Sequence, residues 1–106
     1  MKRIPKSFKL FGHTIKVAVI SKTNWGPLID GITKEEGCSE TCVGLFDPAT
    51  NAIYLVRQPR SQLSHSLWHE TTHAILYYLN HKLYSNEQFV DTVAGCIAQV
   101  IETAEH

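Results

Sequence analysis

The residues best suited to chemistry are those of the segment His69-Glu70-Thr71-Thr72-His73. On an α-helix, two histidines four positions apart lie on one face about one turn apart, so both imidazoles reach a single metal ion. Glu70 projects beside that point, where a carboxylate takes a proton from metal-bound water instead of binding the metal. Apolar residues flank the segment, which a solvated surface helix would not show. The pattern therefore predicts a metal site with a water-activating base. Zinc is the ion that suits two imidazoles and a carboxylate.

A metal held by two histidines needs a third protein ligand, and two residues downstream come into question. His81 lies eight positions past the second histidine, about 12 Å along a straight helix and out of reach. Glu87 is the better choice, because the segment 80–84 can reverse the chain and bring a second, antiparallel helix against the histidines. Asp91, one turn beyond, is placed to accept a hydrogen bond from the far nitrogen of a ligand histidine. Both acidic residues would also suit an ordinary solvated helix.

The first half of the chain is predicted to form strands in front of these helices. Alternating apolar and polar residues predict a hairpin of Lys6–Phe11 and His13–Ile20, with a glycine at the turn. Thr41–Phe46 and Ala52–Val56 are predicted as a second pair, joined by residues with strong turn chemistry. Ser21–Gly37 contains a Gly-Pro pair and a further glycine, so it is predicted to be mostly loop with at most a short helical turn.

The second half is predicted to form two helices. The first runs from a cap at Ser61 or Ser64 to about Asn80 and carries the histidine motif. Ser85 is predicted as the N-cap of the second, with Gln88 completing a capping box. The apolar side of the second helix is predicted to consist of Phe89, Val90, Val93, Ala94, Ile97, Val100 and Ile101. Strands followed by helices predict one α+β domain over residues 1–106, a small and mostly antiparallel sheet packed on two C-terminal helices.

The histidine motif, followed by Asn86-Glu87-Gln88-Phe89-Val90-Asp91, resembles the gluzincin arrangement. In thermolysin-type enzymes an Asn-Glu-x-x-x-Asp segment also follows the motif, after a longer gap. The compact size and element order look like those of small ImmA/IrrE-type and phage-encoded metallopeptidases. The resemblance covers most of residues 41–101 and implies a minimal zincin-like fold and a zinc-dependent metallopeptidase. Its implied site is zinc bound by His69, His73 and Glu87, with Glu70 as catalytic base and Asp91 as a supporting residue.

One part of the thermolysin-type machinery has no counterpart here. Those enzymes carry a large second domain with a histidine that stabilises the oxyanion, and these 106 residues hold no such domain. Tyr77, Tyr84 and His81 are the candidates for that role near the motif. A peptide substrate is expected to add to a sheet edge offered by Thr41–Phe46 or Ala52–Val56, and the sequence leaves open which of the two strands is the edge.

Two other interpretations stay open at this point. Glu36-Gly37-Cys38-Ser39 resembles part of a peptide deformylase segment in which the cysteine is a metal ligand, so Cys38 could replace Glu87. The glycine-rich segment of that family is missing, and Thr72 stands where deformylases have aspartate. Alternatively, the domain holds zinc for stability and acts as a non-catalytic binding or regulatory module. A fourth protein ligand would favour that role, whereas an open position would favour hydrolysis.

Composition limits the partners. Ten basic and ten acidic residues give zero net charge, which argues against a nucleic-acid binder with a broad basic face. No apolar run approaches the length of a membrane span. The three cysteines are few and odd in number, which argues against a disulfide scaffold. Cys96 is expected to be a small apolar residue on the buried side of its helix. We therefore expect a cytoplasmic protein, of a kind that phages and prophages also encode, acting on a peptide or protein.

Overall fold

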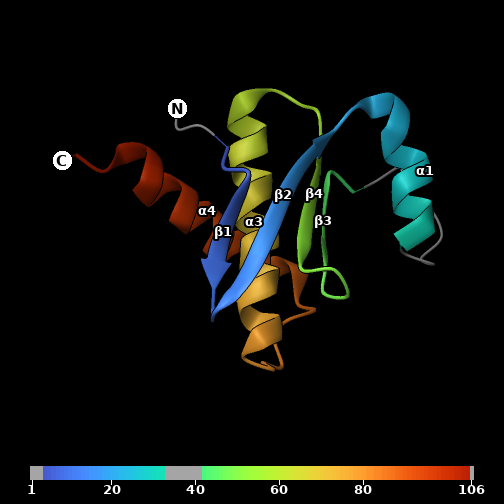
Figure 1. The fold of residues 1–106 in the computed structure, drawn as a ribbon. Helices are drawn as coiled ribbons and strands as arrows, with labels where there is room; N and C mark the ends of the chain where they lie inside the picture. The colour runs from blue at the N-terminus through green and yellow to red at the C-terminus, as the bar shows by residue number, and fades with distance from the viewer. Residues whose placement is uncertain (1–3, 33–41, 106) are drawn as a thin grey trace.

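The computed structural model describes residues 4–32 and 42–105 and combines a four-stranded sheet with helices on both of its faces (Figure 1). In chain order the elements are β1 (Ser7–Leu10), β2 (His13–Ile20), α1 (Lys22–Ile32), β3 (Gly44–Asp47), β4 (Ala52–Val56), α3 (Arg60–Tyr78) and α4 (Glu87–Thr103). The predicted α+β class is confirmed, with strands first and the two main helices last.

The sheet joins the two predicted strand pairs through a parallel contact at its centre. The strand order is β1-β2-β4-β3, with β1/β2 and β3/β4 antiparallel and β2/β4 parallel. The central pair is parallel because the chain returns through α1 and β3 before it reaches β4. Among the described elements β1 and β3 are therefore the edges, and β4 lies inside the sheet. Thr41, where the second pair was predicted to begin, lies outside the described residues.

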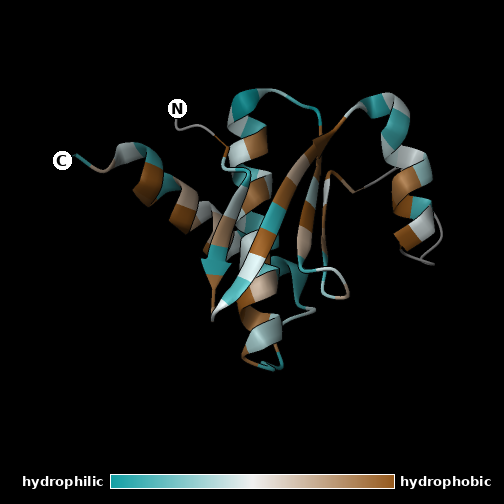
Figure 2. Cartoon of the chain, viewed as in Figure 1, coloured by the Kyte–Doolittle hydropathy of each residue, from teal (hydrophilic) through white to brown (hydrophobic). Residues whose placement is uncertain are grey.

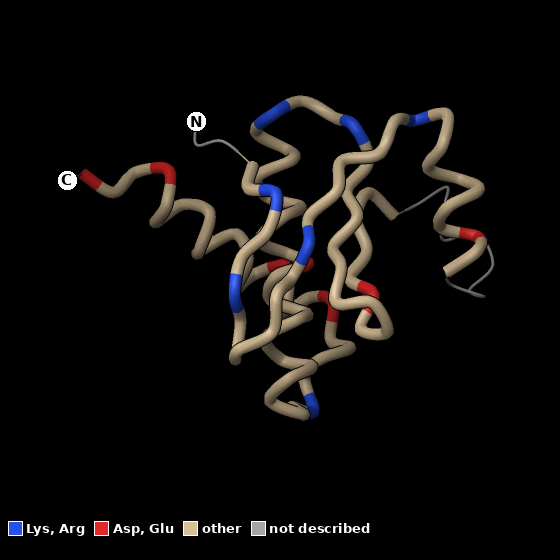
Figure 3. Tube along the Cα trace, in the orientation of Figure 1, with Lys and Arg blue, Asp and Glu red and all other residues tan. Residues whose placement is uncertain are grey.

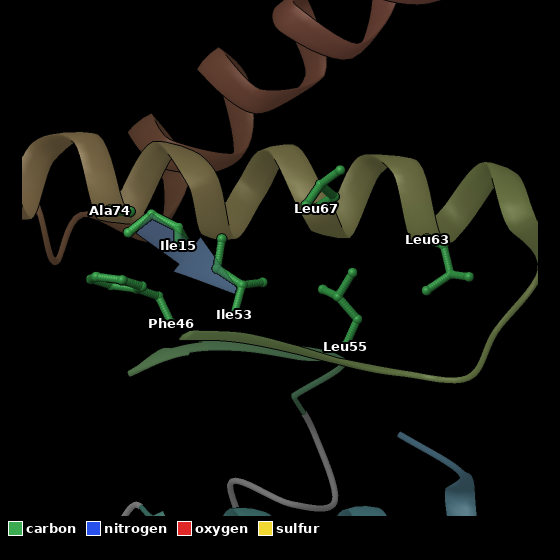
Figure 4. Close-up of a cluster of buried hydrophobic side chains, with 7 residues drawn as sticks. All are labelled: Ile15, Phe46, Ile53, Leu55, Leu63, Leu67 and Ala74. Atoms are coloured by element: carbon green, nitrogen blue, oxygen red, sulfur yellow. The ribbon is translucent and has the colours of Figure 1, made fainter. Parts of the chain in front are cut away.

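The main core lies between α3 and one face of the sheet. Figure 4 shows apolar side chains of α3 facing those of the strands across this layer. The buried cluster consists of Ile15, Phe46, Ile53, Leu55, Leu63, Leu67 and Ala74. Each fully buried aliphatic side chain contributes about 1.5–3 kcal/mol of hydrophobic stabilisation. This layer fixes α3, and with it the histidine motif, against the strands.

The segment predicted to be mostly loop is a helix, α1, of 11 residues. Trp25 and Ile29, four positions apart, are buried against the sheet face opposite α3. Ser21 begins the helix by accepting a hydrogen bond from the backbone N–H of Asn24. Pro27 removes only one helical hydrogen bond, so the burial of the Trp25–Ile29 pair outweighs the local preference for a break. The loop prediction was wrong because it gave Gly and Pro more weight than this pair.

Helix α3 is bounded by backbone geometry and not by the predicted serine caps. It begins at Arg60 after Pro59, whose φ of −53° already suits a helix start, and no side chain caps it. Ser64 is instead buried inside the helix, where its hydroxyl donates to Glu102. At the other end Asn80 adopts a left-handed φ of 51°. The N–H groups of Asn80 and His81 return to the carbonyls of Tyr77 and Leu76, which is a Schellman ending that reverses the chain.

Helix α4 runs back along α3 and begins one residue later than predicted. Its N-cap is Asn86, whose side chain accepts from the N–H of Phe89, so Ser85 is not the cap. The helix packs on α3 through one side only, and its buried residues are Val90 and Ala94. Phe89, Val100 and Cys96 are exposed, contrary to the predicted wide apolar side. Hydrophobic residues nevertheless continue along the helix toward the C-terminus (Figure 2). No described helix is both long and apolar enough to cross a membrane.

Candidate metal centre

Helix α3 directs the motif side chains to two different sides. His69 and His73, one turn apart, face α4, and their rings lie with centroids 5.0 Å apart. Glu70 is rotated by about 100° from His69 and points toward β3. Glu70 and His73 are only 8% and 9% exposed, because α3 lies between the sheet and α4. The helix thus presents two imidazoles toward α4 and, beside them, one carboxylate toward β3.

The chain reversal after α3 brings Glu87 to the two histidines. Because Asn86 is the N-cap, Glu87 is the first helical residue of α4 and lies at the end nearest the motif. Its carboxylate oxygens lie 2.9 Å from Nε2 of His69 and 3.1 Å from Nε2 of His73. The three predicted metal ligands are therefore brought together, and their ligand atoms all lie within 4.8 Å of one another.

The far nitrogens of both imidazoles are held by acceptors. His73 Nδ1 lies 2.8 Å from the carbonyl oxygen of Tyr84, and His69 Nδ1 lies 3.2 Å from Oδ1 of Asp91. A carbonyl or carboxylate oxygen only accepts, so both Nδ1 atoms carry the proton. The lone pair of each neutral ring is then on Nε2, the atom that faces Glu87. Asp91 thus occupies the supporting position predicted for it.

This donor set is suited to a positive charge at its centre. Two Nε2 lone pairs and a carboxylate converge on one point, and three acceptors at hydrogen-bonding distance repel one another unless a cation lies between them. One metal ion at this point would remove that repulsion. The His69, His73 and Glu87 group could therefore hold a metal ion.

Glu70 lies in a tight, largely apolar position next to this group. A Cβ built on Gly44 would lie 3.0 Å from Glu70 Cγ and 3.1 Å from Oε2, so β3 approaches the carboxylate as closely as a glycine allows. The pKa of Glu70 is raised to about 7, mainly because burial desolvates its carboxylate and in smaller part because of the nearby charge of Glu87. The charge of His69 and a backbone hydrogen bond from Phe46 act in the opposite direction. The result is a carboxylate that exchanges a proton near neutral pH.

An open cleft of about 610 Å³ exposes the group to solvent. It is lined by His69, Glu70, His73 and Glu87, by the strand β3, and by Tyr84, Ser66 and Asp91. None of the described residues that line it is Lys or Arg, and Figure 3 shows acidic positions where α3, α4 and β3 meet. The cleft therefore favours a bound cation.

The other predicted site residues are placed differently. Of the three candidate oxyanion donors only Tyr84 lines the cleft, while Tyr77 and His81 do not. Cys38 lies outside the described residues. One residue of the cleft, His65, was missed, although its position four residues before His69 is a visible signal in the sequence. Its Nε2 lies 2.9 Å from Oδ1 of Asp91.

Comparisons of the chain with family models, with curated proteins and with solved structures found no match. The geometry of the cleft is therefore what any functional proposal must explain.

Proposed function

We propose that the protein is a zinc-dependent metallopeptidase whose metal is bound by His69, His73 and Glu87. The observation that carries the proposal is the convergence of two Nε2 atoms and one carboxylate beside a buried, separate carboxylate in an open cleft. Zinc prefers this mixture of imidazole and carboxylate ligands. Donors around a tetrahedral zinc ion are roughly 3.3 Å apart, close to the 2.9 and 3.1 Å measured between Glu87 and the two rings.

Glu70 is proposed as the general base and then the general acid. Zinc, when bound, supplies Lewis acidity toward a substrate carbonyl and an attacking water. The Glu70 carboxylate takes the proton of that water and delivers it to the leaving amine. A pKa of about 7 suits both halves of this task, because a group that titrates near the working pH can accept and release a proton readily. Glu70 is not needed as a ligand, since Glu87 supplies the carboxylate.

Strand β3 is proposed as the platform for an extended peptide. It is a sheet edge among the described elements, and Gly44 and Phe46 line the cleft. The N–H of Val56 donates to the carbonyl of Val43, so alternation along the antiparallel pair turns the backbone groups of Gly44 and Phe46 away from β4. The N–H of Phe46 already donates to Glu70, which leaves the backbone groups of Gly44 to pair with a substrate. The substrate backbone would pair with this edge, and its scissile carbonyl would lie near Glu70.

Tyr84 is proposed as the donor to the developing oxyanion. Its ring lies 5.5 Å from that of His73. Burial and, to a smaller extent, the negative charges of Glu70 and Glu87 raise the pKa of Tyr84, so the hydroxyl keeps its proton. Tyr84→Phe removes only this hydroxyl and leaves the carbonyl that holds His73. We expect turnover to fall by about two orders of magnitude, with zinc affinity unchanged. Equal turnover in the two proteins would rule out this role.

The test of the proposal is zinc content and peptide cleavage in matched variants. Wild-type protein, Glu70→Gln and Glu105→Gln are loaded with zinc, dialysed, analysed for metal and incubated with a mixed peptide library read by mass spectrometry. We expect all three to retain about one zinc per chain, and only Glu70→Gln to lose cleavage. Glu105 is exposed and is not among the residues that line the cleft, so it controls for the loss of a carboxylate as such.

Three outcomes would contradict the proposal. A wild type that retains no zinc would remove the metal site, and full activity in Glu70→Gln would remove the base. A wild type that retains zinc but cleaves no peptide would favour a metal-binding module without peptidase activity. Glu87→Ala and Cys38→Ala, compared by zinc content, test the third ligand: only the first is expected to lose the metal.

A further inference from the structure

His65 makes α3 carry three histidines in one row, at positions 65, 69 and 73. It is not part of the group that could hold the metal. Its Nε2 is directed instead to Oδ1 of Asp91, at 2.9 Å, and the same oxygen lies 3.2 Å from Nδ1 of His69. One carboxylate oxygen of α4 is therefore shared by two histidines of α3.

Protonation follows from the chemistry of that shared oxygen. A carboxylate oxygen only accepts, so His65 donates its Nε2–H and His69 donates its Nδ1–H. Hydrogen bonds from His65 and, next in size, from His69 hold the pKa of Asp91 below its usual range. The two bonds arrive from neighbouring turns of one helix, and together they fix where Oδ1 lies.

Asp91 requires such a second contact because it is exposed. Its side chain is 62% accessible to solvent, whereas that of His69 is only 18% accessible. An exposed aspartate held by one hydrogen bond exchanges readily between rotamers and water. With His65 as a second donor, an Asp91 side chain that moves away from His69 also loses its hydrogen bond to His65.

The ring of His65 is itself seated on α4. A Cβ built on Gly95 would lie 3.7 Å from Cε1 of His65, so the ring lies over a glycine one turn beyond Asp91. A larger side chain at this position would occupy the place of the ring. A methyl group at this position would still be in ordinary contact with the ring, so a residue no larger than alanine leaves room for His65 to reach Asp91 across the helix interface.

We infer that His65 is a positioning residue that holds Asp91 against His69 and so pre-orients the Nε2 of His69 toward the metal. This inference rests on the proposed metal site. It goes beyond it by assigning a role to a histidine that is not among the proposed metal ligands. Partners of this kind keep a ligand ring in the correct tautomer and orientation, and their loss lowers metal affinity by about 10- to 100-fold.

The test compares zinc affinity, by chelator competition, in His65→Gln and His65→Asn. The amide nitrogen of Gln can take the position of Nε2 of His65, whereas that of the shorter Asn can take only the position of Nδ1. Both variants therefore carry the same donor group, but only Gln is long enough to reach Asp91. We expect His65→Gln to bind zinc within about threefold of wild type and His65→Asn to bind about tenfold more weakly. The Co²⁺ absorption spectrum should change in the Asn variant alone. A purely structural role for His65 would not produce this change.

Gly95 offers an independent approach that leaves every polar group in place. Gly95→Leu should displace the His65 ring and weaken zinc binding as His65→Asn does, whereas Gly95→Ala should not. Adding His65→Asn to an Asp91→Ala background should cause no further loss. Equal zinc affinity in wild type, His65→Gln and His65→Asn would overturn the inference.

Failure of the metal site itself is distinguished in metal-free protein. There a double-mutant cycle of His65→Asn and Asp91→Ala measures their coupling through the unfolding equilibrium. A wild type without zinc affinity but with non-additive unfolding would refute the metal site and retain the contact between His65 and Asp91. Additive unfolding would refute the contact as well.

Discussion

Gly44→Ala gives the sharpest test of how β3 and Glu70 fit together. The added methyl group would lie 3.0 Å from Cγ of Glu70, 3.1 Å from its Oε2 and 3.2 Å from Cδ2 of Leu55. Ordinary van der Waals contact begins near 3.4 Å, so all three neighbours must move. Leu55 is fully buried and Glu70 nearly so, which leaves little space for either to yield.

The magnitude follows from two opposing effects. Overpacking a buried position costs about 1–3 kcal/mol. Replacing a strand glycine by alanine returns roughly 0.5–1 kcal/mol through the lower entropy of the unfolded chain. The net cost lies between about 0 and 2.5 kcal/mol, so we expect Gly44→Ala to lower the free energy of unfolding by about 1 kcal/mol. Zinc affinity should change little, because neither Gly44 nor Glu70 is a proposed ligand, and peptide cleavage should fall because the base is displaced.

Urea unfolding of the metal-free protein provides the measurement, with Gly95→Ala as the matched control. Gly95 lies inside α4, and its new Cβ would meet only Cε1 of His65 at an ordinary 3.7 Å. In a helix interior the same substitution should stabilise by up to about 1 kcal/mol. The two glycine-to-alanine changes are therefore expected to differ in sign. If Gly44→Ala is as stable as wild type, with undiminished cleavage, the described contact between β3 and Glu70 is wrong.

Three further predictions concern the elements around the site. Zinc at about 100 times its dissociation constant should raise the free energy of unfolding by about 2.7 kcal/mol, and Glu87→Ala should abolish this shift in a thermal melt. Asn80 has a left-handed φ of 51°, which asparagine tolerates better than alanine because its side chain can hydrogen-bond locally. Asn80→Ala should therefore lower the free energy of unfolding in urea by about 1–2 kcal/mol, whereas Asn80→Gly should leave it unchanged or raise it. Asn86→Ala removes the cap of α4, so it should lower the free energy of unfolding by about 1 kcal/mol and weaken zinc binding. Asn86→Ser keeps a capping oxygen and should retain the stability and the zinc affinity of wild type.

The sequence by itself determined the local features of the protein. A four-residue spacing of histidines is sufficient to place both rings on one helix face, whatever the rest of the fold, because helix geometry repeats over that distance. Alternation in His13–Ile20 predicted β2, and the turn residues before Ala52–Val56 helped to predict β4, both with their observed bounds. The preference for Glu87 over His81 as third ligand came from two sequence arguments: a straight helix carries His81 away from the motif, and the segment 80–84 can reverse the chain.

Only the tertiary structure decided which local preferences prevail. Trp25 and Ile29 keep α1 helical through Gly26, Pro27 and Gly31, because burial against the sheet outweighs the cost of the breaks. The edge position of β3 follows from the parallel pairing of β2 with β4, and no pattern within β3 reveals it.

The arrangement around His69, His73 and Glu87 was likewise decided by long-range packing. His65 and Asp91 are 26 residues apart and meet only because α4 returns along α3 after the Asn80 reversal. The burial that raises the pKa of Glu70 depends on the close approach of Gly44 from another element. Spacing along one helix specifies which groups can face each other, whereas the environment that tunes them is supplied by segments distant in the chain.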